Sequence, residues 1–427
     1  YLTGVARFTN GYKVFMPTEF MHAMYDQGGG AGLRDFWDRW CTNPLFAGGF
    51  IWVYCDEAPK RSDKGGILDS DKSNAPDGVV GPRREKEGSY YAIRAQWSPI
   101  QLKPLLITNH FDGSFLLTNE YTFTNLKECR MTYKVLSCGT PLQGNAEAGK
   151  VIVEGKVQLP SINPGETGTA RFELPDSFRK GDVLELEAFD REGKSICNWT
   201  YPIHLAKQYF ERNLSQTTLT PAPQKAEARQ TSDAIELKSS IVSITFDAAT
   251  GMIRHIKSGE TEVPFKDGPV AVGMKMRYEP SLSYTRHSSD GAIYCAKYKG
   301  AADSIVWRLT NEGLLYMDAI LLNRGSGGGG FDDAFMDAQV FNLGLSFSYP
   351  EQNCSGMKWM GRGPYRVWKN RIPGTNYSIW HKDYNNTITG ESFENLIYPE
   401  FKGYHANLYW ATLEGEKTSF TVYSRND

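Results

Sequence analysis

The chain has 427 residues, more than one ordinary domain needs, so we expect roughly two to four domains. Its formal net charge of -2 and its pI near 6.5 give no electrostatic footprint for nucleic acid or an anionic membrane surface, which excludes both as expected partners. No run of about 18 consecutive apolar residues occurs, so no membrane span is expected.

Cysteine spacing and aromatic content narrow the class of protein further. The seven cysteines form no CxxC pair and no metal-ligand spacing, which argues against a disulfide framework and predicts mostly buried thiols. Cys129 and Cys138 could bridge a hairpin, but this is the less favoured alternative. Aromatic residues make up 13% of the chain, a bias typical of all-β packing that sugar-binding proteins share.

The first 102 residues alternate between strand and helix patterns. Residues 12–19 and 46–54 are expected to be buried strands, and residues 33–40 an amphipathic helix. The segment 87–100 supplies a second helix, which stops before Pro99. This β-α-β-loop-α order is typical of a parallel sheet. A complete eight-stranded barrel takes about 250 residues, so we expect this domain to be only part of one.

Residues 103–208 contain short alternating runs separated by turn sequences, which predicts an all-β, immunoglobulin-like module. The expected strands are 105–111, 114–125, 129–137, 149–159, 169–175 and 182–190. Residues 209–232 are polar and contain prolines, which indicates a linker. Another β region runs from 233 to 427, and within it residues 325–330 (GSGGGG) predict a flexible loop, because the Lys and Ser or Thr of a phosphate-binding loop do not follow.

Two polar residues stand where the first expected strand ends. In parallel α/β architecture functional groups lie at the carboxyl ends of strands, so Glu19 and Trp52, at the ends of neighbouring strands, should face one pocket. A carboxylate beside an aromatic wall suits sugar chemistry, as nucleophile and as platform for the ring. Taken alone, Glu19 could equally form a surface salt bridge, and His22 could be a core histidine that donates to a backbone carbonyl.

The wider stretch is more specific. Residues 18–24 (TEFMHAM) followed by 32–52 (GLRDFWDRWCTNPLFAGGFIW) resemble the nucleophile region of glycoside hydrolase family 2, specifically its β-galactosidases. The resemblance implies that Glu19 is the catalytic nucleophile, that His22 binds sugar hydroxyls and that Trp52 forms the platform under the sugar.

The similarity extends along the chain. Residues 74–82 (NAPDGVVGP) are similar to the family's substrate-side loop, which implies that Asn74 and Asp77 reach the sugar or an ion beside it. No cofactor is required, although an Mg or Na ion is an option for the intact enzyme.

The implied fold is multidomain and mainly β. Residues 1–102 would be the C-terminal portion of a (β/α)8 TIM barrel (strands 7 and 8), 103–208 an immunoglobulin-like β-sandwich, and 233–427 a galactose-mutarotase-like β-supersandwich. Within the last region, residues 359–371 (WMGRGPYRVWKNR) resemble a family motif.

Several residues depart from the family pattern. Val53 and Tyr54 follow Trp52 where the family often has Asp and Trp, while Arg366 and Asn370 replace an acidic residue and an Asp. The sugar is therefore left open between a galactoside and another neutral β-glycoside, such as a mannoside or fucoside.

A retaining glycosidase also needs a second carboxylic acid about 5 to 5.5 Å from the nucleophile. In this family that acid lies upstream, and we expect it outside this chain. Asp26, Asp56 and Glu57 are disfavoured substitutes, and the last two are expected to anchor a loop.

The leading interpretation is a retaining exo-β-galactosidase that hydrolyses terminal non-reducing β-D-galactose and is inactive as this chain alone. Its partners would be a β-galactoside oligosaccharide or glycan and the missing N-terminal half of the same enzyme. The alternative is a non-catalytic carbohydrate-binding or assembly module. A homo-oligomer stays open, as does the choice between a bacterial periplasm and cytoplasm.

Overall fold

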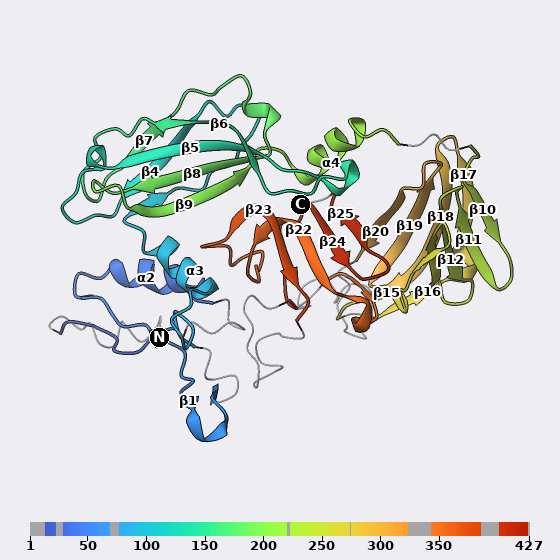
Figure 1. Ribbon diagram of the computed structural model, residues 1–427, viewed down its shortest axis with the longest axis horizontal. Coiled ribbons are helices and arrows are strands. Elements are labelled where there is room, and N and C mark those ends of the chain that lie inside the picture. The colour runs from blue at the N-terminus through green and yellow to red at the C-terminus, as the bar shows by residue number, and fades with distance from the viewer. Residues whose placement is uncertain are drawn as a thin grey trace, which may run out of the picture. The chain divides into compact units, whose positions relative to one another are not determined.

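The computed structural model describes residues 13–22, 29–68, 77–219, 223–273, 275–322, 343–385 and 401–425. These residues form many antiparallel sheets and few helices, as Figure 1 shows, so the chain is a mainly β protein. It divides into two compact units. Unit 1 contains Tyr1–Thr217, Gly356–Thr412 and Thr421–Asp427, and unit 2 contains Thr218–Ser355 and Leu413–Phe420. The region expected to be one C-terminal domain is therefore shared between the two units.

The first part of unit 1 contains two helices, α2 (Leu33–Cys41) and α3 (Gly88–Gln96), at the positions that the sequence predicts. The buried residues of α2 are Leu33 and Trp40, which lie about two turns apart on one face of the helix. Together with Ile93 of α3 and Phe20 they form a small core. A short hairpin, β1 (Lys60–Arg61) with β2 (Ile67–Leu68), lies between the helices in the chain.

The two strands expected before α3 are not continuous. Residues 13–22 and 46–55 contact each other through isolated parallel bridges, Phe15 with Phe46 and Phe20 with Ile51. The parallel direction agrees with the prediction, but the ladder is interrupted at Pro17, which has no N–H to donate. Among the described residues no TIM barrel is seen, so this part of the expected fold is not observed.

A β-sandwich follows in unit 1. One sheet has the order β3 (Ile100–Leu102), β4 (Ser114–Asn119), β7 (Thr167–Arg171), and the other β6 (Lys150–Val157), β5 (Arg130–Ser137), β8 (Val183–Phe189), β9 (Ser195–Pro202). Alternate residues of both sheets, such as Leu117 of β4 and Leu186 of β8, share one core. The predicted strand at 105–111 is wrong, and β9 was not predicted.

The segment expected to be a linker begins inside a helix. Residues Ala206–Ser215 form α4, with Ala206, Tyr209, Phe210 and Asn213 buried along one face. This spacing of three, four and seven residues is a helical signal, but it starts before residue 209, where the polar segment was taken to begin. The linker interpretation is therefore corrected for residues 209–215.

The last sheet of unit 1 is built from the end of the chain. Its order is β23 (Asn376–Asp383), β22 (Gly356–Gly363), β24 (Trp410–Glu414), β25 (Phe420–Tyr423). Met360 and Trp410 of this sheet pack with Tyr209 of α4 and Val183 of β8 in one core. Residues nearly 230 positions apart in the sequence thus stabilise the same unit.

Unit 2 is all β, as predicted for the region after residue 233. A five-stranded antiparallel sheet contains β10 (Glu227–Gln230), β11 (Ala234–Lys238), β12 (Val242–Asp247), β13 (Ile253–Ser258) and β14 (Thr261–Val263). Strand β15 (Asp267–Ala271) pairs with β21 (Leu345–Ser348). The third group contains β16 (Met276–Tyr278), β17 (Tyr284–Ser288), β18 (Gly291–Gly300), β19 (Ala302–Thr310) and β20 (Leu315–Leu321). Residues 325–330, the predicted flexible loop, lie outside the described residues.

Short 3₁₀ turns lie at Ser62–Lys64, Leu126–Glu128, Pro141–Gln143, Phe178–Lys180, Pro280–Leu282 and Glu351–Asn353. None of the seven cysteines forms a disulfide bond, so the hairpin disulfide is absent. Only Cys138, Cys197 and Cys295 are buried, and the expectation of mostly buried thiols is wrong. Across the described ranges, no helix has the length and hydropathy needed to cross a membrane.

Candidate functional site

Backbone hydrogen bonds bring three extended segments of unit 1 together. The Phe20 amide donates to the Phe50 carbonyl at 3.1 Å, and the Trp52 amide donates to the Phe20 carbonyl at 3.3 Å. The next residue, Val53, donates to the Asp77 carbonyl at 3.4 Å. Residues near 20, 52 and 77 are therefore neighbours in this order, which is the arrangement expected when parallel segments end at one edge.

His22 joins two carboxylates at this edge. Its Nδ1 lies 2.9 Å from Asp77 Oδ2, and its Nε2 lies 3.2 Å from Glu19 Oε1. A neutral imidazole donates from only one nitrogen, so both contacts are hydrogen bonds to ionised carboxylates only when the ring carries two protons. Neither of these contacts is the backbone bond expected of a structural core histidine.

Burial changes stepwise across this trio. The side chain of Asp77 is 8% exposed, that of His22 38% and that of Glu19 54%. The carboxylate of Asp77 is therefore an internal anchor, whereas the carboxylate of Glu19 can be reached from solvent. Glu19 and His22 are three residues apart in a segment that is not helical, and Asp77 is 55 residues from His22.

A backbone turn separates the buried and reachable residues. Met21 has a φ of 47°, in the left-handed region that non-glycine residues seldom adopt. Phe20, immediately before it, packs in the core against Trp40 with ring centroids 4.8 Å apart. The turn at Met21 thus allows Phe20 to point into the core and His22, two residues later, to contact the carboxylates.

Of the other two predicted binding residues, Trp52 lies within the described residues and Asn74 does not. The Trp52 side chain is partly exposed, and its backbone is beside Phe20 as described above. Asn74 lies outside the described residues, as does Asp26. The structure therefore brings Glu19, His22 and Asp77 into direct contact and places the Trp52 backbone next to them.

Two further aromatic residues flank Trp52 in the sequence. Phe50 and Tyr54, at alternate positions on either side of Trp52, are both exposed, while Ile51 between them packs against the α2 core. Phe50, Trp52 and Tyr54 thus expose three aromatic side chains within five residues. The alternation of aromatic residues at 50, 52 and 54 is a signal that sequence reasoning missed.

Asp56 anchors the loop that carries Asp77, as expected. Its buried side chain accepts a hydrogen bond from the Gly78 amide at 2.8 Å. A Cβ on Gly78 would lie 2.3 Å from the Asp56 amide nitrogen, so only glycine fits there. Burial, with Asp77 and Glu85 nearby, raises the pKa of Asp56 to about 7 against the opposing Gly78 bond. Glu57 is exposed.

Ser89 of α3 supports the same loop from the other side, because its hydroxyl donates to the Val79 carbonyl at 2.9 Å. An Mg or Na ion would need several oxygen ligands. Asp77 Oδ1 is buried without a hydrogen-bond partner within the described ranges and is one candidate ligand. The described residues contain no group of three or more His, Cys, Asp or Glu side chains that could hold a metal, so they do not by themselves make an ion site.

Comparisons with known proteins point to β-galactosidases. A family model described as "Beta-galactosidase, domain 4" matches residues 115–197, which span the sandwich from β4 to β9. A β-galactosidase of Actinobacillus pleuropneumoniae is 25% identical over 164 residues, which are 36% of this chain and 16% of that protein.

Matches to solved structures are weak. A crystal structure of the exo-chitosanase CsxA of Amycolatopsis orientalis is 10% identical, with a TM-score of 0.17, and the match covers 57% of this chain and 29% of that one. A complex of the same enzyme with PNP-β-D-glucosamine is also 10% identical, with a TM-score of 0.18 and coverage of 64% and 31%. Such TM-scores are too low to establish a shared fold.

This chain spans less than a third of the length of each of these proteins. Its sandwich is similar to domain 4 of β-galactosidases, and the chain is a distant relative of those enzymes.

Proposed function

We propose that this chain supplies the nucleophile half of the active site of a family 2 retaining exo-β-galactosidase, with Glu19 as the nucleophile. The observation that carries the proposal is the contact of His22 with both Glu19 and Asp77, beside the backbone of Trp52. A carboxylate that solvent can reach and that neighbouring groups hold in place suits nucleophilic attack on an anomeric carbon.

The proposed reaction begins at the free oxygen of Glu19. Because His22 contacts Oε1, Oε2 is available to attack the anomeric carbon of a terminal β-D-galactose. The new bond joins Oε2 to that carbon, the bond to the leaving oxygen breaks, and a second carboxylic acid outside this chain gives the leaving oxygen a proton. The same group, now a carboxylate, then takes a proton from water. The oxygen of this water bonds to the anomeric carbon as the bond to Oε2 breaks, and the sugar leaves Glu19.

His22 and Asp77 position this nucleophile. Asp77 is nearly buried and keeps Nδ1 of His22 in place, which directs Nε2 toward Glu19 and the sugar. When a sugar enters, Nε2 can exchange its contact with Glu19 for a contact with a sugar hydroxyl. Trp52 would contact the apolar face of the ring.

The test uses the intact enzyme. Glu19→Gln should lower turnover of p-nitrophenyl β-D-galactoside by about 10³-fold or more, because the covalent step is lost. Glu57→Gln, at an exposed neighbouring carboxyl, is the matched control and should retain activity. A 2-deoxy-2-fluoro-galactosyl fluoride should label Glu19 in a mass-spectrometric peptide map. Unchanged turnover in the Glu19 variant, or a label on another residue, would reject the assignment.

A non-catalytic carbohydrate-binding role for the chain alone is the second candidate. It is favoured by the exposed aromatic side chains of Phe50, Trp52 and Tyr54. Titration calorimetry of the 427-residue chain with methyl β-D-galactoside would support this role if it bound without hydrolysis. Methyl β-D-mannoside and methyl β-D-fucoside in the same experiment would distinguish galactose from other neutral sugars.

A further inference from the structure

The four-stranded sheet of the sandwich has one covered edge and one open edge. At the covered edge β9 contacts β23, where the Tyr377 amide donates to the Thr200 hydroxyl at 2.7 Å. At the other edge β6 pairs with β5 on one side, and no other strand of the described residues pairs with it (Figure 1). An open edge presents unpaired backbone N–H and C=O groups, which can pair with a strand of another chain.

The regular part of β6 is the segment Val153–Val157. Each of its residues has one partner in β5, whereas Ile152 has none, because the register shifts there as it does in a β-bulge. Strand β6 ends at Val157, and the Gln158 amide then donates to the Arg171 carbonyl of the other sheet at 2.7 Å. The open edge is therefore bounded at both ends, and at about 3.4 Å per residue it is about 17 Å long.

The charged side chains of this segment have no strong partner within the chain. Glu154 and Lys156 are exposed, while Val153 and Val157 pack on the core side of the strand. Glu154 is opposite Lys134 in β5, but the ammonium group of Lys134 pairs with Glu185 at 3.2 Å. Among the described residues, neither Glu154 nor Lys156 forms an ion pair or a hydrogen bond through its side chain. Both charges are thus available to a strand that pairs with the edge.

The segment is complementary to itself in the antiparallel direction. Its sequence is Val-Glu-Gly-Lys-Val, so a second copy that pairs about Gly155 places Glu154 of each copy opposite Lys156 of the other. Opposite charges directly across two strands stabilise the pair, and like charges destabilise it. A shift of two residues either way would place Glu154 opposite itself or Lys156 opposite itself. A shift of one residue would turn the core side of one copy to solvent.

The residues next to this segment are apolar and exposed. Val151 is 44% exposed and Ile152 37%, and in the antiparallel pair these two residues lie at each end of the paired segment. Natural edge strands are commonly protected by proline or by unmatched lysine. Strand β6 contains no proline, and a second copy matches Lys156 with Glu154. The edge therefore favours pairing with a copy of itself.

We propose that β6 is a dimerisation edge, through which two copies of this chain pair antiparallel over Val153–Val157 with Gly155 at the two-fold axis. The two four-stranded sheets then form one continuous sheet of eight strands. A paired segment of this length is small beside a permanent interface, which buries roughly 1,200–2,000 Å² or more. The dimer is therefore reversible and depends on protein concentration. This inference does not depend on the proposed sugar chemistry.

The test is sedimentation velocity of the 427-residue chain at low ionic strength, over concentrations from about 2 to about 200 μM, the range suited to a weak interface. The average mass should rise from that of a monomer toward that of a dimer. Hydrogen exchange of a peptide that spans residues 150–158 should become slower over the same range, because outer amides of β6 become bonded. A monomer at every concentration, or exchange that is the same throughout, would overturn the proposal.

Charge variants test the register. Lys156→Glu creates two pairs of like charge and should raise the dissociation constant of the dimer by about tenfold or more. Adding Glu154→Lys to this variant restores both pairs with their signs exchanged, and should return the constant to within about threefold of the parent value. A dimer that is unaffected by Lys156→Glu, or one that the double variant does not restore, would contradict the proposed pairing.

Lys150→Glu is the matched control. Lys150 is an exposed lysine of the same strand, but it precedes the bulge and lies outside the paired segment, so this variant should leave the dissociation constant unchanged. In a register centred on Ile152 it would instead be opposite Glu154, and a dimer lost in Lys150→Glu would overturn the register proposed. All three changes are at exposed side chains, so thermal midpoints near that of the parent chain are expected and confirm that the variants fold.

Discussion

Asp56 gives the sharpest test of the electrostatics beside the candidate site. Its pKa is raised from 3.8 to about 7, chiefly by burial, so the folded chain holds a proton that the unfolded chain releases above about pH 4. The stability that this proton contributes is fully present below about pH 4 and is lost as the pH rises through 7. Above pH 7 the native chain contains a buried charge beside Asp77.

The variant Asp56→Asn has a side-chain oxygen that still accepts the hydrogen bond from the Gly78 amide, and it carries no charge. A shift of about three pKa units corresponds to roughly 4 kcal/mol at full effect, and relaxation of the site reduces this to the order of 2 to 4 kcal/mol. Asp56→Asn should therefore differ least from the parent chain at pH 5 and exceed its stability most at pH 8. The free energy of unfolding of the parent chain should fall between pH 5 and 8 relative to that of the variant.

The assay is urea unfolding at pH 5, 6, 7 and 8, with hydrogen exchange of a peptide that spans residues 77–87 as the local probe. The local probe is needed because a chain of two units need not unfold in a single transition. Glu57→Gln, which removes an exposed neighbouring carboxyl, is the control and should shift stability little at any pH. A difference between Asp56→Asn and the parent that is the same at pH 5 and 8 would refute the reasoning.

Three other substitutions test the packing and the sugar platform. Asp182 is buried, accepts the Cys138 amide at 2.7 Å and forms an ion pair with Arg212, so Asp182→Ala should cost about 3–5 kcal/mol in urea unfolding; Asp182→Asn should cost less, and equal losses would contradict this account. Leu126 is fully buried in the sandwich core, so Leu126→Ala should cost about 2–5 kcal/mol, whereas Phe123→Ala, at a ring that is almost wholly exposed, should leave the thermal midpoint near its original value. Trp52→Ala should weaken binding of methyl β-D-galactoside by roughly tenfold in calorimetry, and Trp52→Phe should retain most of the affinity if the ring is the platform.

Local sequence patterns predicted α2, α3 and most strands of the sandwich. The helix over Leu33–Cys41 follows from apolar residues at helical spacing, and β5 follows from the alternation of Met131, Tyr133 and Val135. These signals are sufficient because both structures satisfy their backbone hydrogen bonds with near or adjacent partners while one face is buried. The pattern failed near residue 209, where the predicted linker began inside the buried face of α4.

The sequence also predicted several residues of the candidate site. The order of Glu19, His22 and Trp52, and the resemblance that it carries, predicts a nucleophile, a sugar ligand and a platform. The contact between Glu19 and His22 depends on the backbone turn at Met21, because residues three apart lie side by side on a helix and not on an extended strand.

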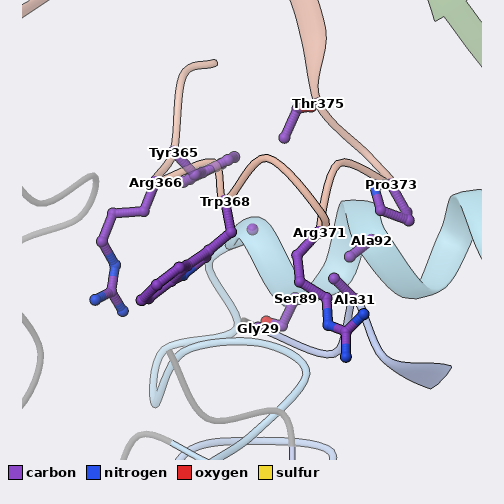
Figure 2. Close-up of a pocket in the computed structure, with 11 residues that line it drawn as sticks. Gly29, Ala31, Ser89, Ala92, Tyr365, Arg366, Trp368, Arg371, Pro373 and Thr375 are labelled. Atoms are coloured by element: carbon purple, nitrogen blue, oxygen red, sulfur yellow. The ribbon is translucent and has the colours of Figure 1, made fainter. Parts of the chain in front are cut away.

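Only the tertiary structure decided what holds and surrounds these residues. Asp77 reaches His22 across 55 positions, and a small cavity of unit 1 (Figure 2) is lined by α3 and by the loop 364–375, segments more than 270 positions apart. The last sheet of the chain packs in unit 1 with Tyr209, although it follows unit 2 in the sequence. Contacts at such separations depend on which buried faces pack together, and packing of that kind is a property of the whole chain and not of any local pattern.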